Sequence, residues 1–448
     1  MTTSALLESR REKAQSFVAP LPVAHAPRTV RVALAGCGVV GGALVRLIEA
    51  ESPSLAARFG LRLELTRVLV RDVGRDRTVR LASGLLTDDV ESFIAAPSDI
   101  VVEAIGGSET SHRIATAALA LGKHFVCANK ALIAAHGPSL SNLAAVSGGT
   151  IDFEAAVGGA IPVVRTVRET LCGIGVSGIR GVLNGTCNFI LDRVADGDAF
   201  DSALSEAQRF GFAEPDPSRD LSGLDAADKV RVLAWLAFGI DPARLPIRIR
   251  GIGPNPEKLV AAAYAAGGVA RLIGECVLTD GGVVASVEPF IMSPGSELGR
   301  VRDENNAFVI DSQSAGQILL AGRGAGGVPT AGAIYADILR AALRPRSSGQ
   351  NSGFAPGLRE HKAHTPSFVP ATEEDTRALR WLLRTEPSSL GEVAEACLAA
   401  GIRFDGAPIP VTYDFCLLPI TATRRALLAL SRDPSLAGCT IDSYRWEP

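Results

Sequence analysis

The sequence lacks the cysteine and histidine patterns that hold metals or crosslink small secreted domains. Its eight cysteines are scattered and include no Cys-x-x-Cys pair, so neither a zinc ribbon nor a disulfide framework is predicted. Reduced, mostly buried thiols in a cytoplasmic protein are the expectation. None of the six histidines is paired at metal-ligand spacing, which argues against a catalytic transition metal.

Long apolar runs and an excess of one charge are also missing. No uninterrupted apolar stretch reaches the roughly 18 residues that a membrane-spanning helix needs. The net charge of −3 gives no reason to expect a nucleic acid or a membrane as partner. Residues 1–28 mix charges with proline and carry no apolar signal core, so we expect a flexible tail rather than an export signal.

A chain of 448 residues has room for two or three domains. In residues 29–150, apolar strands expected at 29–35, 61–70, 100–105 and 124–128 alternate with helical segments. This alternation predicts a Rossmann-type, doubly wound parallel sheet in an α/β protein.

The remaining sequence divides into three parts. Residues 151–327 are rich in glycine and β-branched residues around a long helix at 226–237, which indicates a second, α+β domain. Residues 344–371 have little periodicity and predict a linker. Residues 372–448 show a β-α-β-β-α-β order, which predicts a ferredoxin-like domain.

A glycine-rich turn follows the first predicted strand and opens a helix. In Gly36-Cys37-Gly38-Val39-Val40-Gly41, Gly36 and Gly38 would let backbone N–H groups approach a pyrophosphate, and Gly41 would allow close helix packing. The helix N-terminus would add partial positive charge. The motif therefore predicts a dinucleotide site, and a glycine-rich turn without a ligand is the alternative.

The end of the second strand bears on cofactor choice. It finishes at Arg71, where a basic side chain could pair with a 2′-phosphate. This favours NADP over NAD. A solvated turn would carry the same charges, so NAD stays possible.

Lysine is scarce, with six lysines against 39 arginines. Lys130 follows a predicted strand, and Asp225 and Lys229 stand four apart at the start of a helix, where they share one face. A surface salt bridge is the ordinary interpretation of such a pair. A chain this rich in arginine could use arginine for that purpose, whereas burial can bring the pKa of a lysine into a working range. Lys130 and Lys229 are therefore candidates for chemistry.

Taken together, several motifs resemble homoserine dehydrogenase over about residues 30–343. They are the turn at 36–41, the Ile-Gly-Gly at 105–107, the Ala-Asn-Lys at 128–130, the loop at 154–162, the Asn-Gly-Thr-x-Asn at 184–188, the block at 211–229 and the glycine loop at 322–330. The resemblance implies reversible hydride transfer between L-homoserine and L-aspartate 4-semialdehyde with NAD(P), in threonine and methionine biosynthesis. It also implies a homodimer or homotetramer formed through the second domain, and a helix at 328–343 that completes the Rossmann domain.

The resemblance implies roles for single residues. Lys229 would be the acid and base, and Asp225 would orient the substrate and Lys229. Glu214 would hold the homoserine ammonium group. Lys130 would lie near the substrate and the nicotinamide.

Further positions are implied for the cofactor and for an ion. Gly211 and Gly326 match cofactor-loop positions of the family. A possible structural sodium ion would be bound by the main chain of Glu154, Val157, Gly159 and Ile161. Three positions depart from the common pattern, namely Cys127, Phe189 and Arg323, and Arg323 could alter the cofactor contacts.

The C-terminal segment resembles an ACT domain, an amino-acid-sensing module. Its first loop, 385–391, lacks the Asp-x-Pro-Gly form expected there. Feedback by threonine and a purely dimerising role therefore both stay open. For the whole chain, the alternatives are a dehydrogenase of another amino acid or semialdehyde and a catalytically dead amino-acid or nucleotide sensor. The set of Glu214, Asp225 and Lys229 argues against both.

Overall fold

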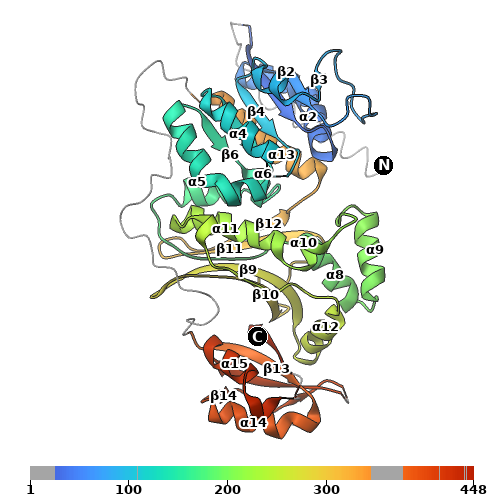
Figure 1. Ribbon diagram of the computed structural model, residues 1–448, viewed down its shortest axis with the longest axis vertical. Coiled ribbons are helices and arrows are strands. Elements are labelled where there is room, and N and C mark those ends of the chain that lie inside the picture. Colours follow the sequence, from blue (N-terminus) through green and yellow to red (C-terminus); the bar gives the residue numbers. More distant parts are fainter. Residues whose placement is uncertain are drawn as a thin grey trace, which may run out of the picture.

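The computed structural model describes residues 26–107, 109–344, 377–412, 414–437, 439 and 441–447. The expected tail, apart from residues 26–28, and the expected linker, apart from Arg344, lie outside these ranges. The described chain is arranged in three layers along its long axis, a Rossmann layer, a central layer and a C-terminal domain (Figure 1). Among the described residues, no helix has both the length and the apolar character needed to cross a membrane.

The Rossmann layer is built on a parallel sheet with the strand order β3-β2-β1-β4-β5-β6. The strands are β1 (Arg28–Ala35), β2 (Leu61–Leu69), β3 (Leu86–Thr87), β4 (Ile100–Glu103), β5 (His124–Cys127) and β6 (Thr150–Asp152). This is the doubly wound order, and it confirms the predicted fold class.

Helices cover this sheet. They are α2 (Val39–Phe59), α3 (Val90–Ala95), α4 (Glu109–Ala120), α5 (Lys130–Ser147) and the later α13 (Gly327–Leu343). The apolar side of α13, including Ile334 and Ile338, shares one buried cluster with Leu34 of β1 and Leu44 of α2. The chain thus returns to the Rossmann layer after it has built the central layer.

The central layer and the C-terminal domain share a second, mixed sheet, which has eleven strands among the described residues. The strands that the central layer contributes to this sheet are β7 (Val176–Val182), β8 (Arg248–Ile249), β9 (Val269–Thr279), β10 (Gly282–Met292), β11 (Asn305–Ser312) and β12 (Gly316–Arg323). Its C-terminal strands are β13 (Leu379–Thr385), β14 (Arg403–Phe404), β15 (Ile409–Pro410), β16 (Cys416–Ala422) and β17 (Asp442–Glu447).

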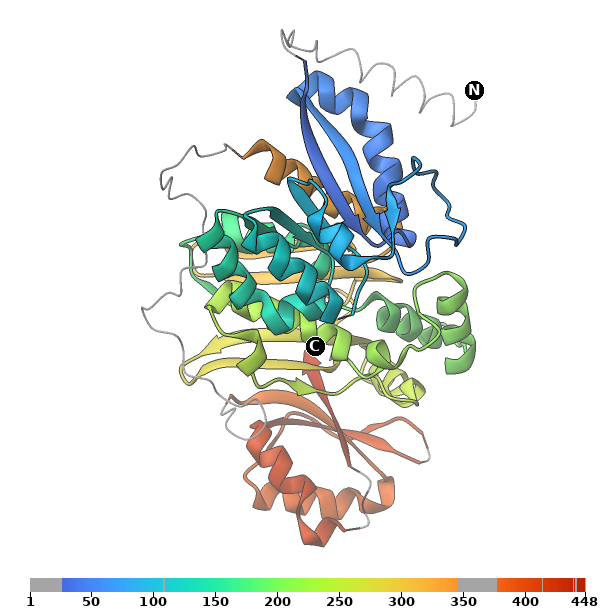
Figure 2. The same cartoon turned by 45° about the horizontal axis from the view of Figure 1, so that its top comes forward.

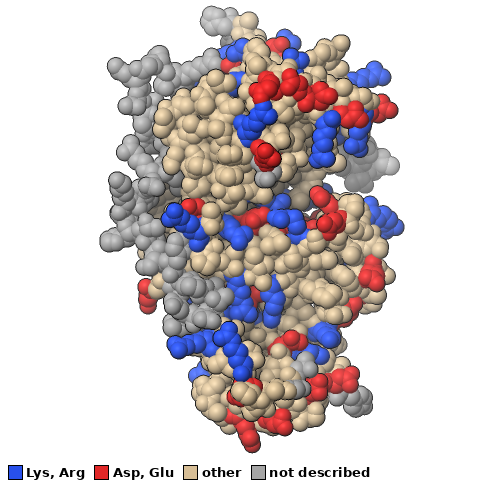
Figure 3. All heavy atoms as spheres, in the orientation of Figure 1, with Lys and Arg blue, Asp and Glu red and all other residues tan. Residues whose placement is uncertain are grey.

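The helices of the central layer lie between the two sheets and at one end of the large sheet (Figures 1 and 2). They are α6 (Glu154–Val157), α7 (Val163–Arg165), α8 (Gly185–Ala195), α9 (Phe200–Arg209), α10 (Ser218–Leu221), α11 (Leu224–Phe238) and α12 (Pro256–Ala265). The stretch 154–162, expected to be a loop, begins instead with the helical turn α6, which the N–H of Gly158 closes on the Glu154 carbonyl at 3.2 Å. On the face shown in Figure 3, both signs of charge are interspersed, and many charged side chains lie level with α10 and α11.

The C-terminal domain adds α14 (Leu390–Ala399) and α15 (Arg424–Ser431), and its strands lie in the order β17-β13-β16-β14. This is the predicted ferredoxin-like arrangement. The sequence did not predict how the domain is attached. β17 leaves it and pairs in parallel with β10, where Phe290 lies opposite Arg445 and Met292 opposite Glu447 (Figure 2).

A buried carboxylate links the Rossmann layer to the central layer. Asp337 of α13 is 2% exposed, accepts the N–H of Glu154 at 3.0 Å and pairs with Arg165 at 3.1 Å. Burial, together with the nearby Asp152 carboxylate, raises the pKa of Asp337 to about 7. The folded protein therefore binds a proton here at pH values where the unfolded chain has released it.

This linkage predicts an effect of pH on stability that Asp337→Asn removes. The contribution of Asp337 to the free energy of unfolding is fully present below the pKa that this carboxyl has in the unfolded chain. It is lost as pH rises toward 7, by up to about 1.4 kcal/mol per pH unit. Free energies of unfolding should be measured at pH 5 and pH 8 for both proteins. The stability of the wild type relative to that of Asp337→Asn should be lower at pH 8 than at pH 5. Asp76→Asn, at an exposed position, is the control. A wild-type-to-Asp337→Asn difference that does not change with pH would contradict the assignment.

Candidate active site

The glycine turn between β1 and α2 has the shape that a dinucleotide needs. Gly36 has φ of +101°, and a Cβ there would lie 2.5 Å from the carbonyl oxygen of Ala104. A Cβ on Gly41 would lie 2.0 Å from the carbonyl oxygen of Gly36, whereas at Gly38 nothing lies within 4 Å. The turn is therefore closed on its protein side and open at Gly38, where the N–H groups of the first turn of α2 are free to bind phosphate oxygens.

A second glycine loop lies beside this turn. Gly326, with φ of +112°, precedes α13, and a Cβ on Gly327 would lie 2.7 Å from Cγ1 of Val39, whose side chain is 78% exposed. Val40 packs partly against the core of the Rossmann layer. The predicted cofactor residues of the two loops are thus neighbours, although nearly 300 residues separate them in the chain.

Arg71 follows β2 and is exposed. The loop after it folds on itself, since the Arg77 guanidinium donates to the carbonyl oxygen of Arg75 at 2.6 Å and to that of Asp72. Arg46 of α2 donates to the Thr78 hydroxyl at 3.2 Å and ties this loop to the helix that carries the glycine turn. A side chain at Arg71 is therefore placed at the carboxyl edge of the sheet, as the sequence predicted.

The two candidate lysines meet at one carboxylate. Nζ of Lys130, the first residue of α5, lies 2.8 Å from Oδ1 of Asp225, and Nζ of Lys229 lies 3.1 Å from its Oδ2. Lys229 is 7% exposed, so the pair on α11 is not the surface salt bridge of the alternative interpretation. Burial by itself would raise the pKa of Asp225, but the ammonium groups of Lys229 and Lys130 outweigh it and hold this pKa well below its usual range.

Further groups orient this lysine centre, formed by Lys130, Asp225 and Lys229. No role was predicted for these groups from the sequence. The Lys229 ammonium donates to the carbonyl oxygen of Leu183 at 2.6 Å. Asn184 caps α8 and donates through Nδ2 to Asp220 at 2.7 Å and to Asp225 at 3.2 Å. Burial and the nearby Asp225 carboxylate raise the pKa of Asp220. The Asn-Gly-Thr motif was visible in the sequence, but nothing in its spacing showed that its asparagine binds two carboxylates 36 and 41 residues away.

A buried acid supports the lysine of α5. Glu103, at the end of β4, is fully buried and accepts the N–H groups of Ile105 and Gly106 and the hydroxyl of Ser111, each at 3.0 Å. Asn129 caps α5 and donates to the Gly107 carbonyl at 2.6 Å. Glu103 thereby fixes the loop to which Asn129 binds. The sequence does show a lone acid within an apolar strand, a signal from which no site residue was predicted.

Comparison with known proteins gives the family. The family model described as "Homoserine dehydrogenase" matches residues 162–339, and the one described as "Homoserine dehydrogenase, NAD binding domain" matches residues 36–154. The chain belongs to the homoserine dehydrogenase family. It is an NAD(P)-dependent oxidoreductase.

Relatives and solved structures agree with this placement. The homoserine dehydrogenase of Bacillus subtilis is 32% identical over 84% of this chain and 87% of its own, and that of Corynebacterium glutamicum is 38% identical over 72% and 74%. The crystal structure of a homoserine dehydrogenase from Thiobacillus denitrificans superposes with a TM-score of 0.82 at 28% identity, over 94% of this chain and 99% of that one. A hyperthermophilic archaeal homoserine dehydrogenase in complex with NADPH gives 0.59 at 26% identity, over 71% and 99%.

Two site residues expected from the family resemblance lie outside the lysine centre. Glu214 and Gly211 are both exposed in the loop between α9 and α10. The Thr186 hydroxyl donates to the Phe212 carbonyl at 2.6 Å and ties this loop to the start of α8, two residues from Asn184. The structure therefore puts Glu214 on a loop anchored beside the centre, and its contact with substrate stays a prediction.

The segment expected to bind sodium is buried and sharply turned. Val157 and Ile161 are buried, Gly159 has φ of +57°, and a Cβ on Gly158 would lie 2.1 Å from the carbonyl oxygen of Ile161. The carbonyl oxygens of Glu154 and Ile161 each accept one N–H, which leaves each a second lone pair. In the part of the chain that the structure describes, no three His, Cys, Asp or Glu side chains are grouped to hold a metal ion.

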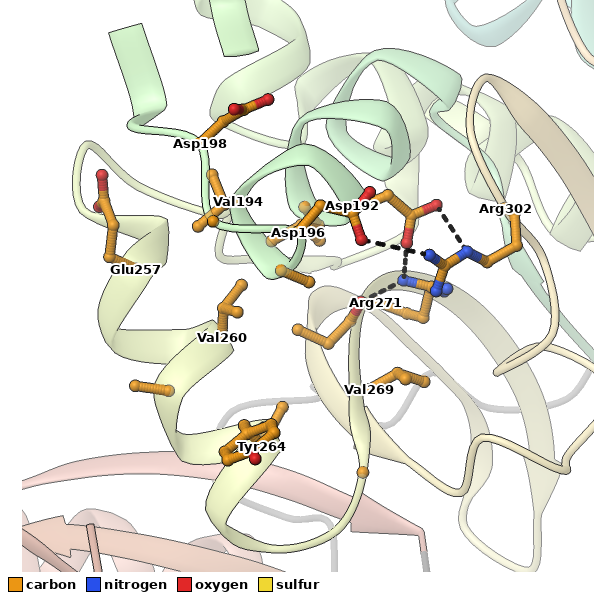
Figure 4. A pocket seen from close by; sticks show the side chains of 17 residues that line it. Asp192, Val194, Asp196, Asp198, Glu257, Val260, Tyr264, Val269, Arg271 and Arg302 are labelled. Carbon is orange, nitrogen blue, oxygen red and sulfur yellow. Dashed lines mark hydrogen bonds and ion pairs between the residues drawn. The ribbon is translucent and has the colours of Figure 1, made fainter. Parts of the chain in front are cut away.

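A cavity of about 530 Å³ lies away from this site, between the end of α8, α12 and the start of β9 (Figure 4). Its charged end is a buried structural ion pair, in which Asp192 lies 3.1 Å from Arg271 and accepts the N–H of Asp303 at 2.7 Å. These groups bind one another, and none of them is among the predicted site residues.

The lysine centre predicts a large loss of activity for Asp225→Asn. Without the carboxylate, two neighbouring ammonium groups lack their shared partner and Lys229 loses its orientation, so turnover should fall by roughly 10²-fold and the midpoint of urea unfolding should drop. Asp228→Asn, on the same helix but paired with Arg219 and Arg231 near the surface, is the matched control. Equal effects of the two substitutions would remove Asp225 from the centre of the site.

Proposed function

We propose that Lys229 is the acid and base of the family's reaction, the reversible hydride transfer between L-homoserine and L-aspartate 4-semialdehyde. The observation that carries this proposal is the geometry at Nζ. An ammonium group has three N–H donors. One points to the carbonyl oxygen of Leu183 at 2.6 Å and one to Asp225 at 3.1 Å, which leaves the third for a substrate oxygen.

The same geometry sets the direction of proton transfer. In the reducing direction, Lys229 gives its third proton to the aldehyde oxygen, and in the oxidising direction it takes the proton of the homoserine hydroxyl. Asp225 orients the lysine in both directions and stabilises its protonated form, which gives the proton in one direction and results from the transfer in the other. Lys130 is bound to the other oxygen of Asp225 and comes from the Rossmann layer. It would lie near the substrate and the nicotinamide.

The cofactor, when bound, supplies or accepts the hydride. Its pyrophosphate would be held by the glycine turn, through the main chain of Gly36, Gly38, Val39, Val40 and Gly41. Gly211 and Gly326 would border it. Arg71 would pair with a 2′-phosphate, which makes NADP the preferred cofactor in this proposal.

Other parts of the proposal concern binding rather than chemistry. Glu214 would hold the ammonium group of homoserine, because a carboxylate on an anchored loop is a suitable partner for a cation. Sodium would be bound by the main-chain carbonyls of the 154–161 segment. For the C-terminal domain, threonine binding and subunit association, in a dimer or tetramer, remain two alternatives. A cytoplasmic location fits the eight free cysteines.

The assignment of Arg71 is tested by measuring L-homoserine oxidation at alkaline pH with NADP and NAD in parallel. NADP should be preferred, and Arg71→Ala should raise KM for NADP about tenfold or more, because it loses a charge-assisted hydrogen bond, while KM for NAD stays unchanged. Arg62→Ala, exposed on the same strand, is the control. Equal use of both cofactors and no effect of Arg71→Ala would assign Arg71 to a solvated turn. No turnover with either cofactor would favour another substrate or a sensor.

The assignment of Lys229 predicts that Lys229→Ala lowers turnover by roughly 10²-fold or more, the usual size of general acid–base catalysis. Its affinity for NADPH, followed by fluorescence titration, should stay near that of the wild type, because the glycine turn is untouched. Lys258→Ala, at an exposed lysine on α12, should behave as the wild type. Near-normal turnover of Lys229→Ala would exclude this lysine as the proton donor.

A further inference from the structure

The 248–252 segment lies between the turn that precedes α11 and the C-terminal domain. Its first two residues form β8, which pairs in parallel with Ser286 and Val287 of β10. The N–H of Arg250 donates to the Val287 carbonyl at 2.7 Å, and the N–H of Ile252 donates to the Leu221 carbonyl at 3.1 Å. The segment is therefore hydrogen-bonded to the large sheet on one side and to the 221–223 turn on the other.

Contact with the 221–223 turn is backbone against backbone. A Cβ on Gly251 would lie 1.8 Å from the carbonyl oxygen of Leu221 and 2.6 Å from the carbonyl carbon of Ser222. Gly223 has φ of +83°, and a Cβ there would lie 3.3 Å from Cγ2 of Ile249. At Gly251 no side chain separates the segment from the turn, so a shift of one requires a shift of the other.

The turn lies between two acids of the site. Asp220, immediately before it, is bound by Asn184 at 2.7 Å, and Asp225 follows it in the first turn of α11. Gly223 also accepts the N–H of Ala227 at 2.9 Å and so belongs to the start of the helix. The position of the turn thus sets where Asp225 holds Lys229.

On its other side, the segment is held by the C-terminal domain. The Arg250 guanidinium lies over the ring of Tyr444, on β17, with 5.5 Å to the ring centroid. Nε of Arg248 lies 3.9 Å from Oε2 of Glu288, a fully buried acid whose other oxygen is bound by Arg424, the first residue of α15. Both arginines of the segment therefore meet groups that the C-terminal domain supplies or shares.

We propose that Arg250 and Gly251 are positioning residues of the active site, through which the C-terminal domain holds the 221–223 turn and with it Asp225 and Lys229. This inference rests on the proposed role of Lys229. It gives the C-terminal domain a part in turnover in the absence of any effector. A displacement of about 1 Å at a catalytic group costs on the order of 10²-fold in rate, so a partial loss of the support should cost less than that.

Tyr444→Leu tests the proposal, because it removes the ring under Arg250 without touching the site. In steady-state oxidation of L-homoserine it should lower kcat roughly tenfold and leave KM for the cofactor within about twofold, since the glycine turn is remote. Tyr444→Phe keeps the ring and should restore kcat. Tyr264→Leu, the same change at a tyrosine that is 87% exposed, is the matched control and should have wild-type kinetics.

Gly251→Ala tests the other side of the contact. It should lower kcat at least as much as Tyr444→Leu, because the added methyl group must displace the turn. If Gly251→Ala does not fold, Tyr444→Leu decides alone.

A measurement that needs no turnover separates this proposal from the proposed function. Hydrogen–deuterium exchange at residues 219–226 should be faster in Tyr444→Leu than in the wild type and unchanged in Tyr264→Leu. If the wild type oxidises no homoserine, the proposed function fails, whereas the exchange result still reports on the contact. Unchanged kcat and unchanged exchange in a folded Tyr444→Leu would overturn the positioning role.

Discussion

The two ion pairs of the Asp225 carboxylate are the interactions on which the rest of the candidate site depends. The carboxylate lies between two ammonium groups from different layers, Lys130 from the start of α5 and Lys229 from its own helix. Two positive charges in a largely buried place are stable only while the negative charge stays between them. The carboxylate therefore fixes both lysines at once, and whatever moves the start of α11 moves both of them.

Close packing of α5 on α11 makes this shared contact possible. A Cβ on Gly137 of α5 would lie 2.7 Å from the ring of Trp235 on α11, so only glycine allows the helices to approach so closely. The same ring also stacks on Phe153, where the chain leaves the Rossmann sheet, at 5.8 Å between centroids. The junction of the two layers and the lysine centre are thus parts of one packed unit.

What could be predicted from the sequence depends on near neighbours in the chain. The turn at 36–41 and the pair of Asp225 and Lys229 could be interpreted because a few residues carry the whole motif. Glu103 could not be assigned in the same way, because its contact with Ser111 forms only once β4 and α4 are packed together. The pairing of β17 with β10 joins residues about 155 apart, and no local pattern specifies that register.

Arginine and lysine occupy different kinds of position in this chain, and the difference follows from their chemistry. Buried structural pairs in this chain use arginine, as in Arg271 with Asp192 and Arg424 with Glu288, where a planar group that stays charged can bind several acceptors. Lys123 is a structural exception with a clear cause, since its ammonium donates to three acceptors, two carbonyls and the Ser98 hydroxyl, and a compact group with three donors suits them. Lys130 and Lys229 share one carboxylate. In the proposed mechanism Lys229 gives up a proton, which an arginine at position 229 would keep. The scarcity of lysine is therefore informative at the site where, in the proposed mechanism, a basic side chain gives up its proton.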